Sequence, residues 1–175
     1  MMDKMVVRLD KVKAVRAGHI YSVIDEANEL QNGMVAKLDG LVEGERELQN
    51  IANPGTDSSL VLIANPEVSY EECRTAEKAL GNYSIPAGTP ARAYELAKTD
   101  IISISANGID GTPVVGEFVI GQAGSKKLAA AETVTNETFV GKVIDKEKIG
   151  TTTAVGMPGV TGKETEFIVI EVVSN

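Results

Sequence analysis

Short apolar runs of strand length, separated by turn-forming residues, follow one another along most of this chain. Several of these runs alternate apolar and polar side chains, as strands with one buried face do. The dipeptides Asn32-Gly33 and Asp39-Gly40 are typical hairpin turns. We predict strands over residues His19–Ile24, Met34–Gly40, Leu60–Pro66, Ala91–Leu96, Ile101–Ala106, Thr112–Gly121, Lys126–Glu132, Glu137–Asp145 and Thr165–Val173.

Only one segment carries helix signals. In Ser69–Gly81, Ser69 can cap the first turn, Glu72 can complete a capping box, and Gly81 suits the residue after the helix. Many strands and one short helix predict a mainly β protein, an antiparallel β-barrel or sandwich. A Gly/Thr-rich loop over residues 150–162 precedes the last strand.

The first 18 residues differ in charge from the rest. Residues 1–20 carry five basic and two acidic side chains, whereas the whole chain has a net charge of −8. We predict an extended N-terminal arm (1–18) and a β-rich body (19–175) of one domain or two small β subdomains. The arm could dock on an acidic partner, or be a solvated, poorly ordered terminus, and Met5–Leu9 could be an added strand. Its basic residues, Lys4, Arg8, Lys11, Lys13 and Arg16, are interface candidates.

Composition excludes several classes of protein. A chain of 175 residues can bury a sizeable core, and the single cysteine, Cys73, cannot form an intrachain disulfide, which fits a reducing compartment. The excess of acidic residues disfavours nucleic acid as a partner. With no long apolar run and no apolar segment near the N-terminus, we expect neither a transmembrane helix nor a secretory signal, and no membrane partner.

No motif for catalysis or metal binding is present. His19 is the only histidine, and no nucleophile motif accompanies it. The segment Gly156–Lys163 resembles a phosphate loop, but five residues separate its glycines and Glu164 follows the lysine, so we reject that interpretation. We therefore predict no catalytic, metal-binding or cofactor-binding residue, and no enzymatic activity.

The stretch IPAGTPARAYELAKTDIISIS (Ile85–Ser105) contains a rigid corner, because Pro86 and Pro90 restrict the backbone. We predict a hairpin after this corner, with a turn at Leu96–Asp100. Arg92 has no partner donors that would make a phosphate site. Arg92 and Tyr94 are therefore further candidates for a protein interface.

Four stretches of the chain follow one another in a characteristic order: NGMVAKLDGLVEGERE (Asn32–Glu47), LVLIANPEVSYEE (Leu60–Glu72), AGTPARAYELAKTDIISISANGIDG (Ala87–Gly111) and VVGEFVIGQAGSKKL (Val114–Leu128). This order resembles the small head decoration proteins of tailed bacteriophages. In that family a pattern AGKPARAY-L-KGD-FSVT precedes a VGKYV strand. Here Thr89 and Thr99 stand where the pattern has Lys and Gly, and the resemblance covers roughly residues 19–130.

The resemblance implies a structural virion protein. It would be made in the host bacterial cytoplasm, bind the major capsid protein on the exterior of an icosahedral capsid, and stabilise the shell against packaged DNA. Repetition over a shell adds avidity to weak contacts, and a homo-oligomer such as a trimer would suit such a lattice. The alternatives are another phage structural module, of the tail or baseplate, and a ligand-binding or enzymatic β-barrel.

Overall fold

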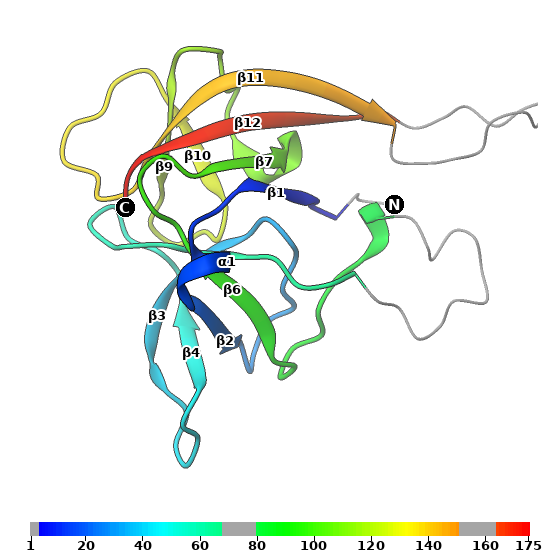
Figure 1. Ribbon diagram of the computed structural model, residues 1–175, viewed down its shortest axis with the longest axis vertical. Helices are drawn as coiled ribbons and strands as arrows, with labels where there is room; N and C mark the ends of the chain where they lie inside the picture. Colours follow the sequence, from blue (N-terminus) through cyan, green and yellow to red (C-terminus); the bar gives the residue numbers. More distant parts are fainter. Residues whose placement is uncertain (1–3, 68–79, 151–163) are drawn as a thin grey trace, which may run out of the picture.

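A closed five-stranded barrel and a seven-stranded sheet make up the fold (Figure 1). The computed structural model describes residues 4–67, 80–150 and 164–175. The prediction of a mainly β fold containing a barrel is confirmed. Cys73, nearly all of the predicted helix over Ser69–Gly81 and most of the Gly/Thr-rich loop lie outside the described residues. A 3₁₀ turn, η1 (Leu80–Asn82), follows the first gap.

The barrel closes because its last strand pairs back on its first. In spatial order it consists of β2 (Ile20–Ile24), β4 (Leu48–Ala52), β3 (Val35–Leu41), β5 (Val61–Ile63) and β6 (Ala91–Glu95), and β6 pairs with β2. All pairings are antiparallel except β2 with β4. Ala91 and Ala93 point into the interior, where their small side chains pack beside Val23 and Ile63.

The sheet is built around a long hairpin. Its strands, in spatial order, are β1 (Val7–Lys11), β7 (Ile101–Ser105), β12 (Glu164–Ser174), β11 (Val140–Gly150), β9 (Phe118–Gly121), β10 (Leu128–Ala131) and β8 (Ile109–Asp110). β11 and β12 pair along almost their whole length. As the sequence alternation predicts, Ile168, Ile170 and Val172 share the core-facing side of β12. A 3₁₀ turn, η2 (Ala106–Gly108), joins β7 to β8.

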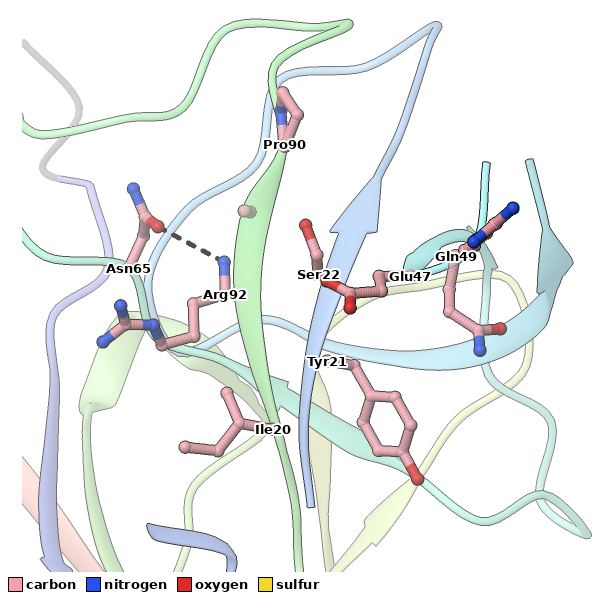
Figure 2. Close-up of a pocket in the computed structure, with 10 residues that line it drawn as sticks. Ile20, Tyr21, Ser22, Glu47, Gln49, Asn65, Pro90 and Arg92 are labelled. Carbon is pink, nitrogen blue, oxygen red and sulfur yellow. Dashed lines mark hydrogen bonds between the residues drawn. The ribbon is translucent and has the colours of Figure 1, made fainter. Parts of the chain in front are cut away.

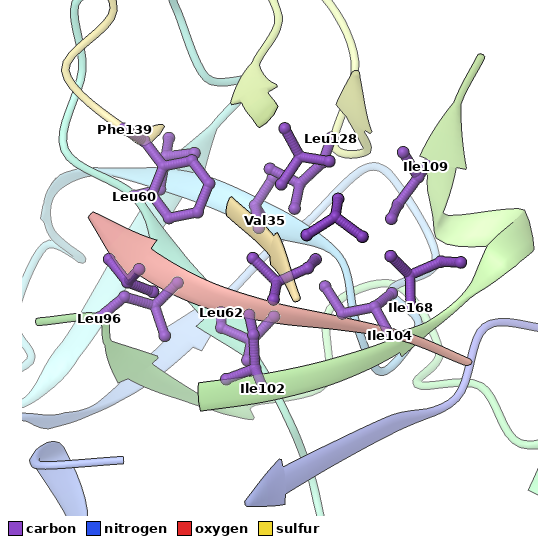
Figure 3. Packing of buried hydrophobic residues seen from close by; sticks show 14 residues of the cluster. Val35, Leu60, Leu62, Leu96, Ile102, Ile104, Ile109, Leu128, Phe139 and Ile168 are labelled. Carbon is purple, nitrogen blue, oxygen red and sulfur yellow. The ribbon is translucent and has the colours of Figure 1, made fainter. Parts of the chain in front are cut away.

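One hydrophobic core lies between the barrel and the sheet (Figure 3). Val35, Leu60 and Leu62 enter it from the barrel side and are fully buried. They pack against sheet residues that include Ile102 and Ile168. Burial of an aliphatic side chain contributes about 1.5–3 kcal/mol, so this shared cluster holds the two β units together.

Polar contacts also connect the two units. The ammonium of Lys126, from the β9–β10 loop, lies 2.7 Å from the carboxylate of Asp25, which follows β2, and both side chains are nearly buried. The side chain of Asn175 accepts a hydrogen bond from the Leu60 N–H (2.7 Å) and donates to the carbonyl groups of Leu60 (2.9 Å) and Leu96 (2.8 Å). The end of the sheet strand β12 is thus fastened to the barrel.

From residue 4 onward the N-terminal segment belongs to the sheet and does not form a free arm. Met5 and Val6 are buried, and β1 pairs antiparallel with β7. The structure therefore has the added strand that Met5–Leu9 could form, because its apolar side chains gain burial only when paired. A short helix, α1 (Ala14–Ala17), then leads to β2.

The predicted hairpin over residues 91–106 is wrong. β6 belongs to the barrel, and β7 pairs with β1 and β12 in the sheet. β7 has buried side chains on both faces, including Ile102 and Ser103, and β1 and β12 occupy both of its edges, so no edge is left for β6. The turn Ala97–Asp100 is present, but it carries the chain from the barrel to the sheet.

Two predicted hairpin turns also have other roles. Asn32-Gly33 does not join paired strands, because β3 pairs with β4 and β5. Asp39-Gly40 lies inside β3, where the register shifts, and Gly40 has a φ of +92°. It is therefore a bulge, and the chain turns between β3 and β4 at residues 42–47. Both Glu43 and Glu45 in this turn are exposed.

Candidate interaction surface

An open groove of about 680 Å³ crosses the outer surface of the barrel (Figure 2). β2 and β6 run side by side along it, and the start of β4 borders β2 on the other side. Most of its side chains are polar, which suits a protein or peptide partner better than a small apolar ligand. The groove is lined by Ile20, Tyr21, Ser22, Arg46, Glu47, Gln49, Asn65, Pro90, Ala91 and Arg92.

Hydrogen bonds fix the backbone of β6 at the groove. The Arg92 N–H donates to Oδ1 of Asn65 at 3.2 Å, and Nδ2 of Asn65 donates to the Tyr83 hydroxyl at 2.8 Å. The buried side chain of Asn32 pairs with the backbone of Asn65, accepting from its N–H (2.8 Å) and donating to its carbonyl (2.9 Å). Arg92 therefore projects from a rigid strand, while its side chain remains exposed.

Arg92 also borders a second, smaller pocket of about 260 Å³, which we call the β1–β6 pocket. Val7 and Leu9 of β1 and Tyr94 of β6 line it, so the structure brings the N-terminal segment next to the Ile85–Ser105 stretch. Tyr94 itself is only 7% exposed and packs against Ala14. Its side chain serves the core, which leaves little of it for the interface predicted from the sequence.

Intramolecular contacts already satisfy much of the N-terminal basic charge. Lys4 forms an ion pair with Glu29. Arg8 lies 3.0 Å from Glu147 and 3.1 Å from Asp10, and its guanidinium covers the ring of Phe167 at 6.0 Å. The hydrogen bond to Glu147 is the main reason why the pKa of Arg8 is raised.

The remaining N-terminal candidates differ in their surroundings. Nζ of Lys13 donates to the carbonyl of Lys98 at 3.2 Å. Lys11 is exposed and has no ion pair among the described residues. Arg16 lies in α1, and its side chain is outside the described part of the structure. Of this group, Lys11 is the described cation most available to a partner.

Titratable groups beside the groove pair with one another. Nδ1 of His19 lies 2.7 Å from Glu95, whose carboxylate also accepts the Tyr21 hydroxyl at 3.2 Å. Partial burial, with the nearby Glu95 charge, raises the pKa of Tyr21. At the β1–β6 pocket, loss of hydration raises the pKa of Glu67 although a hydrogen bond from Asn32 opposes this.

Arg46 and Gln49 were not recognised from the sequence as site residues. In the stretch LVEGERELQNI (Leu41–Ile51), every second residue from 43 to 47 is glutamate, a spacing typical of a continuous strand with Arg46 on the side opposite these carboxylates. Instead the chain turns at residues 42–47, which exposes Arg46 and Glu47 together at the groove. The exposure of Arg46 at the groove could have been predicted only from the position of this turn. The sequence favours a turn at Asp39-Gly40 instead, because that dipeptide is the stronger turn signal.

Within residues 4–67, 80–150 and 164–175, no cluster of three or more His, Cys, Asp or Glu side chains is arranged to hold a metal ion. The helices of these residues include none that is long and apolar enough to span a membrane.

Comparisons of the chain with protein-family models, with curated proteins and with solved structures found no match. The resemblance to phage head decoration proteins therefore rests on the sequence stretches quoted above.

Proposed function

We propose that this protein is a structural virion protein of a tailed phage. In this proposal it binds the major capsid protein on the outer face of an icosahedral head and stabilises the shell against packaged DNA. It acts without enzymatic activity or a cofactor, repeated over the shell as a monomer or a small homo-oligomer.

The observation that carries the proposal is the conformation of the turn in the KGD part of the family pattern. Thr99, where the pattern has Gly, has a φ of +74°, the left-handed conformation that glycine adopts most easily. A turn of this shape therefore favours the glycine that the family pattern contains, although this chain forms it with Thr. This agreement between a sequence pattern and a backbone angle supports the resemblance.

The next residue of the pattern also has a structural role. Asp100 is fully buried, and its carboxylate accepts hydrogen bonds from the N–H groups of Ala97 (2.8 Å) and Lys13 (3.1 Å). Its backbone carbonyl accepts from the Val172 N–H at 2.8 Å. Asp100 therefore joins α1, the turn and β12, and this structural role supports the resemblance to a pattern that has aspartate at the same position.

Binding to heads tests the proposal. Purified protein would be mixed with heads that lack it and, separately, with purified tails of the same phage, and each mixture would be sedimented. We expect saturable co-sedimentation with heads and none with tails. Sedimentation with tails alone would support the tail or baseplate alternative, and binding to neither would contradict the proposal.

A further inference from the structure

Two arginines in the barrel groove lack an acidic partner. Neither Arg46 nor Arg92 forms an ion pair with any described residue, whereas Arg8 contacts two carboxylates. The chain has 25 acidic against 17 basic residues, so carboxylates are not scarce. Within the part of the chain that the structure describes, two guanidinium groups on one surface of an acidic protein thus have no carboxylate partner.

The other polar side chains of the groove add to this donor surface. Ser22 is exposed and Gln49 is half-buried, and no described hydrogen bond involves either side chain. Among the described residues that line the groove, Glu47 is the one carboxylate. Asn65 is already engaged with Arg92 and Tyr83, so it positions β6 and leaves ligand binding to its neighbours.

The geometry favours a ligand that reaches across a strand. Arg92 lies on β6 and Arg46 lies just before β4, and these strands flank β2 on opposite sides. Neighbouring strands lie about 4.8 Å apart, and Arg46 precedes by two residues Leu48, which is level with Ser22 and Arg92, so the two positions are separated by roughly 12 Å. An extended peptide, which rises about 3.4 Å per residue, spans this distance in about four residues, and side chains four residues apart lie on the same face of such a peptide.

We propose that the groove binds an extended acidic segment of a partner protein, with one carboxylate on Arg46 and another on Arg92. Guanidinium groups bind carboxylates through paired hydrogen bonds, and Ser22 and Gln49 can bond to the peptide backbone. Nucleic acid is disfavoured, because its regularly spaced phosphates need several cations along a binding surface, whereas Arg46 and Arg92 are the two cations among the described residues that line the groove. This inference does not depend on the virion function.

A blocked hexaglutamate peptide is a suitable probe. It would be titrated into ¹⁵N-labelled protein, with hexaglutamine and single-stranded oligothymidine as controls. We expect saturable shifts of the Ser22, Gln49 and Arg92 amides with hexaglutamate and none with hexaglutamine. No saturable shift in the groove, or tighter binding of the oligonucleotide, would overturn the proposal.

Substitutions assign the binding to the groove. Arg46→Gln and Arg92→Gln should each weaken hexaglutamate binding at least fivefold, while Glu47→Gln should strengthen it. Lys148→Gln removes an exposed cation on β11 and should leave the affinity unchanged. An equal loss in Lys148→Gln would indicate general charge attraction and contradict the site. Self-association that Arg92→Gln abolishes would identify a second copy as the occupant, and it would also contradict the proposal.

Discussion

At the residue scale, Thr99 is held in a conformation that disfavours its side chain. It is the one non-glycine residue with a positive φ in the described part of the chain, and its N–H donates to the Val172 carbonyl. The left-handed conformation costs an L-residue about 1–2 kcal/mol. Replacement by glycine removes this cost, but part of the gain is offset because glycine increases the conformational entropy of the unfolded chain. This residue therefore stores strain at the junction of barrel and sheet.

Thr99→Gly should stabilise the protein by about 0.5–1 kcal/mol, because it relieves this strain. Thermal unfolding followed by circular dichroism measures the change as a rise of about 1–4 °C in Tm. The control is Thr89→Gly, the other departure from the family pattern, since Thr89 does not have a positive φ. Thr89→Gly should lower Tm slightly. A decrease in Tm for Thr99→Gly would show that the turn is not strained.

The nearly buried ion pair between Asp25 and Lys126 should contribute strongly to the stability of the protein. Removing one partner of a buried ion pair leaves the other charge unpaired, so Lys126→Met should cost about 3 kcal/mol at pH 7 in urea unfolding. The neighbouring Lys127 forms only an exposed contact with Asp110 at 3.5 Å. Lys127→Met should therefore cost less than about 0.5 kcal/mol. Equal effects of the two substitutions would contradict the role given to Lys126.

The same pair gives a pH dependence of stability. Burial alone raises the pKa of Asp25, but hydrogen bonds from Lys126 and from the Ala27 and Asn28 N–H groups outweigh it, so the pKa is lowered. Its stabilising contribution is complete above the unfolded pKa of about 3.9 and is lost as the pH falls through the lower folded pKa. The free energies of unfolding of wild type and Lys126→Met should therefore converge in strong acid.

At the element scale, β11 offers two glycines with opposite surroundings. A Cβ at Gly141 would lie 2.5 Å from Cγ2 of Ile170 and 2.9 Å from Cγ2 of Val119, whereas a Cβ at Gly150 would have no described residue within 4 Å. Gly141→Ala should destabilise the protein by about 2 kcal/mol, and Gly150→Ala should be neutral or slightly stabilising. Urea unfolding measures both. Equal stability of the two variants would mean that β11 does not pack on β9 and β12 at Gly141.

The strands themselves were easier to predict from the sequence than the strands with which they pair. Leu60–Ile63 is a buried strand region, and β12 has the predicted alternation, because burial leaves a local signal in side-chain type. Pairing leaves no such signal. The sequence of β6 and β7 suits a hairpin equally well, and only the competition for places in the barrel and the sheet separates them.

The candidate groove could be predicted only in part for the same reason. Arg92 is recognisable as an unsupported cation next to a rigid corner. Arg46 joins it because β4 lies parallel to β2, a long-range pairing that no local pattern encodes. Tyr94 is adjacent to the same stretch but packs inward, since β6 is covered by α1 at this position.

At the scale of the whole molecule, the barrel and the sheet should unfold together. Val35, Leu60 and Leu62 of the barrel side lose their packing when the sheet leaves, and the contacts of Asn175 with Leu60 are broken as well. Differential scanning calorimetry should therefore show one transition, with equal calorimetric and van't Hoff enthalpies. Two resolved transitions would instead indicate two independent β subdomains.

On a capsid, every copy of this protein would form the same weak contact with the shell. Each copy presents an acidic body with local cations at Arg92 and Lys11, and repetition converts modest single affinities into stable decoration. The exposed side chains of these two residues make them the first to examine at a capsid interface.

Cryo-electron microscopy of phage heads assembled with and without the protein tests the central proposal most directly. We predict additional density on the capsid exterior only in heads that contain the protein, with a shape that accommodates the barrel and the seven-stranded sheet. Identical heads in the two preparations, or density for the protein solely at the tail, would contradict the proposed function.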